Sequence, residues 1–203
     1  MNGNPRATFF DAIADKWDGW ESLDELGRKL ADGFDAMGVS PDETVLDIGC
    51  GTGNLTRALL ARLSPTGRVI AVDISPRMIE VARRKVCDER VSWHTIDASR
   101  LPLPAEHCHR VFCFSVWPHL EDPGAAAIEF RRVLKPGGQI HIWHLISRAR
   151  VNEIHATADS AVSHDNLPPA EETACLLDRL GFQTVSLADT AEHYLVTAVK
   201  SPR

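Results

Sequence analysis

The stretch of residues 45–60 constrains the fold more than any other part of the sequence. Apolar positions lead into the glycines Gly49, Gly51 and Gly53, and helix-forming residues follow at once. This order predicts a buried strand, a tight turn and then a helix. Glycines in such a turn carry no Cβ, so a ligand can approach the backbone, and the first N–H groups of the helix face it. The stretch therefore predicts an α/β fold with a ligand site at this turn.

Carboxylates stand beside the predicted turn and at the end of the next strand. Asp47 lies just before the first glycine, and Asp73 belongs to an apolar strand at residues 68–74, about 20 residues after the last glycine. An acid at this distance binds ribose hydroxyls in doubly wound α/β folds. Binding both hydroxyls of a cis-diol requires both oxygens of Asp73 to be free acceptors. The alternative is that Asp73 only caps the helix whose start is marked by Ser75.

Later segments continue the alternation of strands and helices, with proline and glycine turns between them. Strands are expected at residues 91–98, 110–116, 139–144, 184–187 and 194–200, and helices at 6–37, 54–63, 76–87 and 170–180. The third strand ends in another acid, Asp97, which is followed by Ala98. Residues 133–138 form a Val-Leu-Lys-Pro-Gly-Gly turn before the fifth strand.

Taken in this order, the glycine turn with Asp47, the acids Asp73 and Asp97 and the Lys-Pro-Gly-Gly turn resemble class I S-adenosylmethionine-dependent methyltransferases. The likeness covers about residues 40–200 and points to the small-molecule type that is similar to the quinone-biosynthesis methyltransferases. It implies a Rossmann-like doubly wound seven-stranded sheet with helices on both faces. The sheet would be mostly parallel, with one antiparallel strand near the C-terminus.

The resemblance implies S-adenosylmethionine as the cofactor. Its sulfonium explains Asp47, because a carboxylate attracts a cation and would repel a pyrophosphate. In the family, an acid at the end of the third strand accepts a hydrogen bond from the adenine amino group, and Asp97 matches that position. The residues expected to bind the cofactor are Asp47, Gly49, Cys50, Gly51, Gly53, Asn54, Asp73, Ile74, Met78, Asp97, Ala98, Phe114 and Ser115.

We expect one methyltransferase domain at residues 1–203, since this length suits a single α/β domain. Its parts are an N-terminal helical cap at 1–40, a cofactor-binding core at 41–146, a lid insertion at 147–167 and a C-terminal helix and strand pair at 168–203. In the cap, Trp17 packs either over the cofactor or only against the core. The basic face of the helix at 76–87 is expected to be solvated.

The acceptor site is expected at the carboxyl ends of the fourth and fifth strands, where a parallel sheet opens its crevice. His119 and His144 are the candidate catalytic residues, with structural hydrogen bonding as the alternative role. The candidate substrate-binding residues are Trp17, Trp117, His119, His144, Asn152, His155 and His164. The histidines near the lid have two further readings, as incidental residues of a polar helix or as ligands of a metal- or tetrapyrrole-associated acceptor.

Composition limits the cellular compartment and the kinds of binding partner that we expect for this protein. The chain has 44% hydrophobic and 25% charged residues and a formal net charge of −6, which argues against electrostatic binding to nucleic acid or anionic membranes. The N-terminus has no signal-peptide core, and the sequence has no apolar run of about 18 residues. Five cysteines without a Cys-x-x-Cys pair fit a reducing compartment. We therefore expect a cytoplasmic protein with a small-molecule methyl acceptor.

Other functions share some of these features. His107, Cys108 and His109 could suggest zinc, but their spacing does not let them converge tetrahedrally, so no metal site is expected. A nicotinamide-dependent oxidoreductase would share the first strand and its acid, but the glycine spacing and Asp97 disfavour it. A non-catalytic cofactor-binding protein would keep the same motifs. Methyl transfer needs chiefly alignment and desolvation, so the sequence specifies no obligatory catalytic residue.

Overall fold

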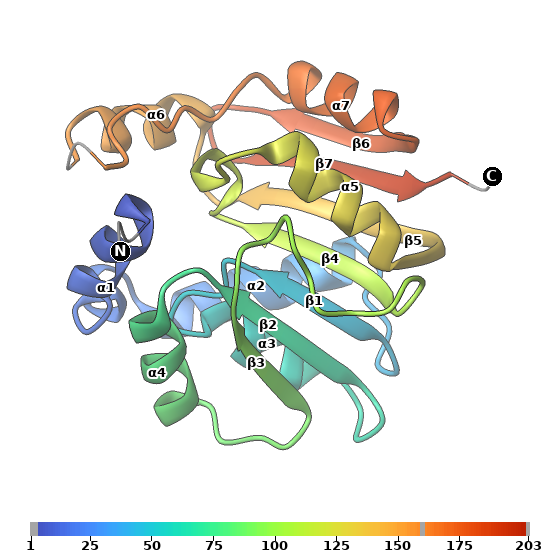
Figure 1. Cartoon of the computed structure of the whole chain (residues 1–203), viewed down its shortest axis with the longest axis horizontal. Helices are drawn as coiled ribbons and strands as arrows, with labels where there is room; N and C mark the ends of the chain where they lie inside the picture. The colour runs from blue at the N-terminus through green and yellow to red at the C-terminus, as the bar shows by residue number, and fades with distance from the viewer. Residues whose placement is uncertain (1–3, 159–160, 202–203) are drawn as a thin grey trace. The chain divides into compact units, whose positions relative to one another are not determined.

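The computed structural model describes residues 4–158 and 161–201, so residues 1–3 of the expected cap, residues 159–160 of the expected lid and residues 202–203 lie outside the described residues. Its strands form a seven-stranded sheet in the order β3-β2-β1-β4-β5-β7-β6. The neighbours β5 and β7 are antiparallel, as are β7 and β6 (Figure 1). The predicted fold class, with one antiparallel strand near the C-terminus, is confirmed. The chain divides into two compact units, Met1–Asp97 and Ala98–Arg203.

The described part of the first unit has three parallel strands. They are β1 (Thr44–Ile48), β2 (Arg68–Asp73) and β3 (Val91–Thr95). Apart from their first residues, β1 and β2 are buried, which explains their continuous apolar runs. The outer strand β3 is only partly buried and alternates in sequence. It ends at Thr95, so Asp97 follows the strand rather than closing it.

Helices cover these strands, and side chains cap several of them. They are α1 (Pro5–Ile13), the 3-10 helix η1 (Trp17–Trp20), α2 (Leu23–Ala36), α3 (Asn54–Arg62) and α4 (Pro76–Lys85). The long helix expected at the N-terminus is thus two α-helices joined by η1. Ser22 and Ser75 cap α2 and α4 by accepting N–H bonds three residues on. Helix α4 packs on β2 and β3, whereas α3 packs on β2 and α2.

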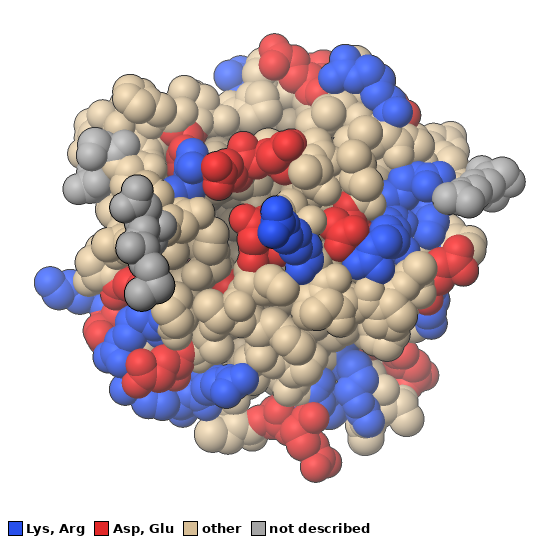
Figure 2. Space-filling view, in the orientation of Figure 1, with Lys and Arg blue, Asp and Glu red and all other residues tan. Residues whose placement is uncertain are grey.

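Ionic contacts connect the N-terminal segment to α4, so the basic face expected to be solvated is exposed at Arg83 and Arg84 but is also partly paired with acids. Asp15 pairs with Arg77 at 2.7 Å and with Arg84 at 3.3 Å. Asp18 pairs with Lys85 at 2.7 Å. Figure 2 shows acidic and basic side chains interleaved over this region of the first unit. The acids at positions 11, 15 and 18 recur at helical spacing, and this spacing is visible in the sequence. The acidic face that it indicates matches the basic face of α4.

Among its described residues, the second unit has four strands and three α-helices. The strands are β4 (Cys108–Phe114), β5 (Leu134–His144), β6 (Phe182–Asp189) and β7 (Tyr194–Lys200). The helices are the 3-10 helix η2 (Trp117–His119), α5 (Pro123–Val133), α6 (Arg148–Ala156) and α7 (Ala170–Arg179). Strand β5 is parallel to β4, α5 packs on β5, and α7 packs on β6 and β7. None of the helices within residues 4–158 and 161–201 is long and apolar enough to cross a membrane.

We expect Asp18→Asn to lower the free energy of unfolding by about 1–3 kcal/mol at pH 7, because Asp18 accepts charge-assisted and neutral hydrogen bonds at once. Burial raises the pKa of Asp18, but hydrogen bonds from Lys85, Thr52 and Asn54 lower it by more. The net pKa therefore lies below the ordinary value of an aspartate. The stabilisation should therefore be present above about pH 4 and lost as the pH falls below it.

Urea unfolding of the variant and of Asp32→Asn, a change at an exposed position of α2, measures this difference. Equal losses of stability in the two variants would show that the contact between the N-terminal segment and α4 contributes nothing.

Candidate functional site

The glycine turn after β1 separates a ligand-facing position from a packing position. Gly51 has φ +52°, and a Cβ added there would meet no atom within 4 Å. Gly53 has φ +82°, and its Cβ would lie 3.1 Å from the Trp93 ring and 3.2 Å from the Ala82 methyl group. The last glycine is therefore required for close packing of the turn on α4 and β3. The middle glycine leaves open space where a ligand can reach the backbone.

Asp73 is fastened to the turn and to the start of α4. One carboxylate oxygen accepts the Gly51 N–H at 2.8 Å, and the other accepts the Ser75 N–H at 2.8 Å. Burial raises the pKa of Asp73, opposed by the hydrogen bonds from backbone N–H groups. The expectation that both oxygens are free is therefore wrong. Because each carboxylate oxygen has two acceptor directions, these two bonds leave one direction on each oxygen.

Asp47 lies beneath the turn and contacts the first turn of α3. It is 1% exposed, and the Thr56 hydroxyl donates to it at 2.6 Å. Burial raises the pKa of Asp47 to about 7, and the negative charge of Asp73 raises it as well. Two neighbouring buried carboxyl groups near the open face of Gly51 favour a cationic ligand over an anionic one.

Both amide atoms of Asn54 make hydrogen bonds to protein groups. Its amide nitrogen donates to Asp18 at 3.0 Å, and Lys85 donates to its amide oxygen at 2.7 Å. The Thr52 hydroxyl also donates to Asp18, at 2.6 Å. Sequence reasoning did not find Asp18 and Lys85, which tie the N-terminal segment to the glycine turn.

Asp11 also connects the N-terminal segment to the core of the unit, at the residues that follow β2. It accepts hydrogen bonds from the Ser75 hydroxyl at 2.5 Å and from the Arg77 N–H at 3.0 Å. Trp17, the aromatic candidate of the cap, is half-buried, and its ring lies 6.2 Å from that of Phe10 and 5.3 Å from that of Trp20. The N-terminal segment thus contacts residues that follow both β1 and β2.

The remaining cofactor candidates of the first unit differ in exposure. Cys50 and Met78 are buried, whereas Ile74 and Asp97 are partly exposed. Burial raises the pKa of the Cys50 thiol well above its ordinary value, so this cysteine is not a thiolate. Gly49 has φ +63° and opens the turn.

In the second unit, the candidates Phe114 and Ser115 stand where β4 ends. Ser115 has φ +54°, a left-handed conformation that is costly for a residue with a side chain. Its N–H donates to the Trp143 carbonyl at 2.9 Å, and the Phe114 and Trp143 rings lie 5.2 Å apart. Ala98 is buried at the start of this unit, and Trp117 is 1% exposed. Such strain at the end of a parallel strand is typical of a functional position.

Histidines from β5, η2 and α6 gather with one carboxylate of the second unit. Nδ1 of His119 lies 2.9 Å from a carboxylate oxygen of Asp165, and the His119 and His155 rings lie 4.6 Å apart. Nδ1 of His155 bonds the backbone carbonyl of Asp165. His144 is 2% exposed, and burial, then the charges of His119 and His155, lower its pKa to about 3. Burial also lowers the pKa of His155.

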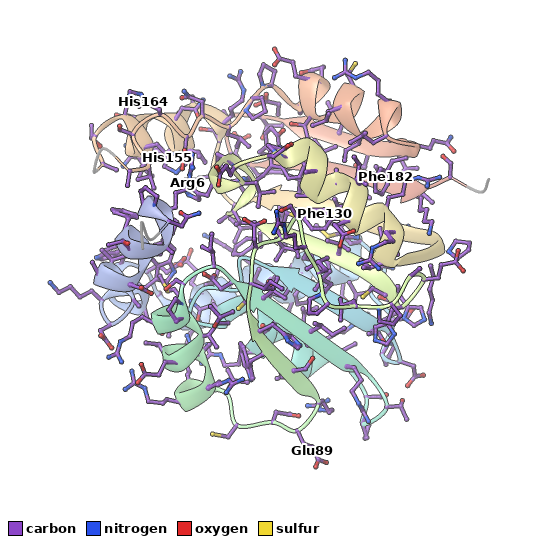
Figure 3. The ribbon with its side chains drawn as sticks, viewed as in Figure 1. Arg6, Glu89, Phe130, His155, His164 and Phe182 are labelled. Atoms are coloured by element: carbon purple, nitrogen blue, oxygen red, sulfur yellow. The ribbon has the colours of Figure 1, made fainter. Side chains whose placement is uncertain are left out.

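The other two candidates of the lid segment do not join this histidine cluster. Asn152 uses its amide on the Leu167 backbone, accepting the N–H at 2.7 Å and donating to the carbonyl at 3.2 Å. His164 is exposed and His155 is half-buried. Figure 3 labels both side chains, in α6 and in the loop that follows it. Within the described ranges, no three His, Cys, Asp or Glu side chains meet in an arrangement suited to a metal ion. Cys108 is buried, which raises the pKa of its thiol to about 12.

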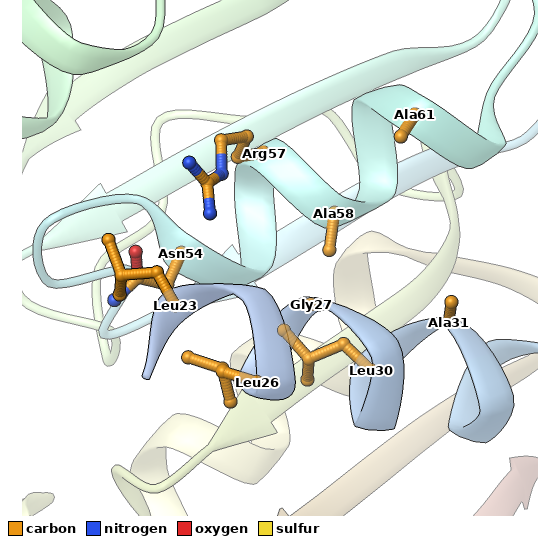
Figure 4. Close-up of a pocket in the computed structure, with 9 residues that line it drawn as sticks. All are labelled: Leu23, Leu26, Gly27, Leu30, Ala31, Asn54, Arg57, Ala58 and Ala61. Atoms are coloured by element: carbon orange, nitrogen blue, oxygen red, sulfur yellow. The ribbon is translucent and has the colours of Figure 1, made fainter. Parts of the chain in front are cut away.

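A groove between α2 and α3 includes one of the cofactor candidates, Asn54, in its lining (Figure 4). It has a volume of about 190 Å³ and is lined by Leu23, Leu26, Gly27, Leu30, Ala31, Asn54, Arg57, Ala58 and Ala61. Small side chains on the facing helices leave this space. It includes neither of the buried carboxyl groups nor the open face of Gly51.

Comparison with known proteins adds independent support. Residues 45–138 match a family model described as a methyltransferase domain. The chain is 29% identical over 207 residues to the methyltransferase GfsG of Streptomyces halstedii, covering 92% of this chain and 71% of that protein. It is 33% identical to the ubiquinone/menaquinone biosynthesis C-methyltransferase UbiE of Cupriavidus necator, covering 67% of this chain but only 58% of that protein. The chain spans less than two thirds of the length of several such relatives.

Solved structures share the fold. A methyltransferase from Aquifex aeolicus described as S-adenosylmethionine-dependent superposes with a TM-score of 0.70 at 18% identity, covering 89% of this chain and 99% of that chain. The [4+2]-cyclase SpnF superposes with a TM-score of 0.71 at 18% identity, covering 87% and 81%. The family model over residues 45–138, the named methyltransferase relatives and the Aquifex aeolicus structure thus agree that this chain is similar to S-adenosylmethionine-dependent methyltransferases.

We expect Gly51→Ala to abolish most S-adenosylmethionine binding, because its Cβ would occupy the open space at the turn. The variant should also be less stable, since alanine at φ +52° is strained by about 1–2 kcal/mol. Gly38→Ala is the matched control, because Gly38 has φ +64° and open space around its Cβ but lies at the end of α2. Calorimetry should show intact binding in the control. Equal affinity in the two variants would remove Gly51 from the cofactor site.

Asp47→Asn should change the pH dependence of stability. The folded pKa of about 7 lies above the unfolded value of about 3.9, so the protonated carboxyl stabilises the fold below about pH 4 and this contribution is lost as the pH rises to 7. The amide cannot ionise, so the variant should gain stability relative to the wild type between pH 5 and pH 8. Urea unfolding of the cofactor-free protein across that range measures the gain. A constant difference would show that Asp47 is ionised throughout.

Proposed function

We propose that this protein is an S-adenosylmethionine-dependent methyltransferase that acts on a small-molecule acceptor. The observation that carries the proposal is the pairing of Asp73 with Gly51, which puts a buried carboxylate beside a backbone position with open space for a ligand. The ribose diol would bind the remaining acceptor directions of Asp73. The adenine would lie toward Ile74 and Asp97, which are partly exposed.

The acceptor would bind in the second unit, at the carboxyl ends of β4 and β5. The groups that support this proposal are Trp117, His119, His144 and His155, together with the strained Ser115. Asn152 is better placed to hold the lid loop through Leu167 than to touch a substrate. His164 is exposed and is not part of the proposed pocket.

The chemistry asked of these residues is modest. A nucleophile of the acceptor attacks the methyl carbon in line, the S–CH₃ bond breaks, and its electron pair returns to sulfur to give S-adenosylhomocysteine. Because the leaving group loses a positive charge, the protein contributes mainly by aligning the partners and excluding water. A base is needed only where the acceptor carries a proton on the attacking atom.

Two other functions stay open to experiment. The likeness to SpnF supports a cofactor-binding fold that carries another reaction, since fold alone does not fix function. A metal- or tetrapyrrole-associated acceptor would have to bring its own ligands, since the described side chains provide no metal cluster. A nicotinamide cofactor is disfavoured by the two buried carboxyl groups at the turn.

The same features support proposals for the domain organisation, the compartment and the partner of this protein. We propose that the chain acts as one methyltransferase domain, with the cap, core, lid and C-terminal parts at the limits expected from the sequence. A reducing compartment such as the cytoplasm fits its five cysteines, all of which are free thiols. The net charge of −6 supports a small molecule over nucleic acid as the partner.

We expect Asp73→Ala to weaken S-adenosylmethionine binding by about 1.5–3 kcal/mol, the free energy of charge-assisted hydrogen bonds. Titration calorimetry with S-adenosylmethionine, with NAD as a second ligand, measures this loss in the folded variant. Asp178→Ala is a control at a carboxylate that accepts backbone and hydroxyl bonds on the surface. Unchanged affinity in Asp73→Ala would remove the ribose role. Tighter binding of NAD to the wild type would overturn the methyltransferase proposal.

A further inference from the structure

The groove between α2 and α3 is an elongated apolar space within the first unit. Its lining extends over residues 23–31 of α2 and 54–61 of α3. Figure 4 shows Leu23 and Asn54 together at one end, so the two helices run in the same direction along the groove. Residues 54–61 rise about 10 Å along the helix axis, or about two helical turns. The groove therefore has the length of a short extended chain.

Gly27 lies in the wall of this groove although its own packing does not require a glycine. A Cβ added there would meet no atom within 4 Å, and the φ of Gly27 is not positive. Alanine would therefore fit, and alanine stabilises a helix interior relative to glycine. Gly53 differs, because its Cβ would lie against Trp93 and Ala82. An open space that is kept at a cost in stability is typical of a functional site.

Arg57 is the charged residue of the groove lining. The lining has no acidic residue, and apart from Arg57 and Asn54 it consists of leucine, alanine and glycine. Arg57 is exposed, and within the described residues it has neither a hydrogen bond nor an ion pair. One helical turn further along α3, by contrast, Arg62 pairs with Asp35 of α2 at 2.6 Å. The Arg57 guanidinium is therefore available to a ligand in the groove.

Asn54, the other polar residue of the lining, is already in use. Its amide nitrogen donates to Asp18 at 3.0 Å, and its amide oxygen accepts from Lys85 at 2.7 Å. Lys85 is also paired with Asp18, at 2.7 Å. Burial lowers the pKa of Lys85, the contacts with Asp18 oppose this, and the like charge of Arg57 lowers it as well. Arg57 thus adds a positive charge at this end of the groove, where the charges of Asp18 and Lys85 offset each other.

We propose that the groove binds a small carboxylic acid with an unbranched apolar chain, its carboxylate on Arg57 and its chain along Ala58, Ala61 and the apolar side chains of α2. A guanidinium suits a carboxylate because it offers parallel N–H groups to the two oxygens. A neutral ligand would leave the guanidinium without a partner, and a cationic ligand would be repelled by it. This proposal is independent of the proposed methyltransferase function.

The size of the groove limits the ligand. Its volume of about 190 Å³ lies below the range of pockets for drug-sized molecules, about 300–1,000 Å³. It exceeds an apolar cavity of about 150 Å³ that admits benzene. One short chain therefore fits, and hexanoate is a suitable probe. The alcohol 1-hexanol carries the same chain without the charge.

Methyl NMR tests the site directly. In the whole chain labelled at alanine methyl groups, hexanoate should shift the signals of Ala58 and Ala61 in a saturable way, with assignments from Ala58→Gly and Ala61→Gly. Hexanoate should bind at least about 5-fold tighter than 1-hexanol, a free-energy difference of about 1 kcal/mol. Equal affinity for the two probes, or no saturable shift of either alanine, would overturn the proposal.

The role of the charge is tested by a pair of arginine variants. Arg57→Gln should lower the affinity for hexanoate at least about 5-fold and leave that for 1-hexanol unchanged. Arg28→Gln is the matched control, because Arg28 is exposed on the facing helix and is not part of the lining. Its affinity for hexanoate should equal that of the wild type. The same affinity in both variants would show that Arg57 does not hold the carboxylate.

Substitutions of Gly27 test the space itself. The side chain of Gly27→Leu would occupy the groove, so hexanoate should no longer shift the alanine signals. The smaller Gly27→Ala should weaken hexanoate binding and raise Tm, measured by scanning calorimetry. Wild-type affinity for hexanoate in either folded variant would place the ligand elsewhere and contradict the proposal. Titration with S-adenosylmethionine tests the methyltransferase proposal separately, because neither Gly27 nor Arg57 is among the cofactor candidates.

Discussion

The hydrogen bond between the Asp73 carboxylate and the Gly51 N–H is the interaction on which the candidate cofactor site depends. It joins the turn after β1 to the end of β2, two elements that are 22 positions apart in the chain. A glycine at positive φ is flexible by itself, so the turn needs a fixed partner to keep one shape. The same carboxylate accepts the Ser75 N–H and so orders the start of α4. Glycine turn, acid and helix start therefore form one unit.

The N-terminal segment adds a second layer of ionic contacts to that unit. Asp11 contacts the start of α4, and Asp18 contacts Thr52, Asn54 and Lys85 near the glycine turn. Exposed ion pairs contribute little singly, but these carboxylates also accept hydrogen bonds from hydroxyl and amide groups. These contacts connect the N-terminal segment to the glycine turn and to the start of α4.

The fold and the glycine turn could be predicted because their signals are local. Apolar runs, glycine spacing and strand-end acids each lie within a few residues, and their order identified the fold. The two backbone hydrogen bonds that Asp73 accepts could not be predicted, since the partners of a carboxylate depend on which N–H groups reach it in space. Asp165 was missed for a similar reason, because it stands 46 positions from His119 in a segment without a strand or a motif. The acids of the cap were visible at helical spacing but had no evident partner until α4 was placed.

The buried pair Asp47 and Asp73 has a consequence for the order of charges during a reaction cycle. Burial raises the pKa of both carboxyl groups, to about 7 at Asp47, and the negative charge of Asp73 adds to the rise at Asp47. A sulfonium bound nearby would draw the pair toward full ionisation, whereas a neutral thioether would let a proton return. The glycine turn would then distinguish the cofactor from the spent product by charge rather than by shape. The change from bound sulfonium to bound thioether would be accompanied by the uptake of a proton from solvent.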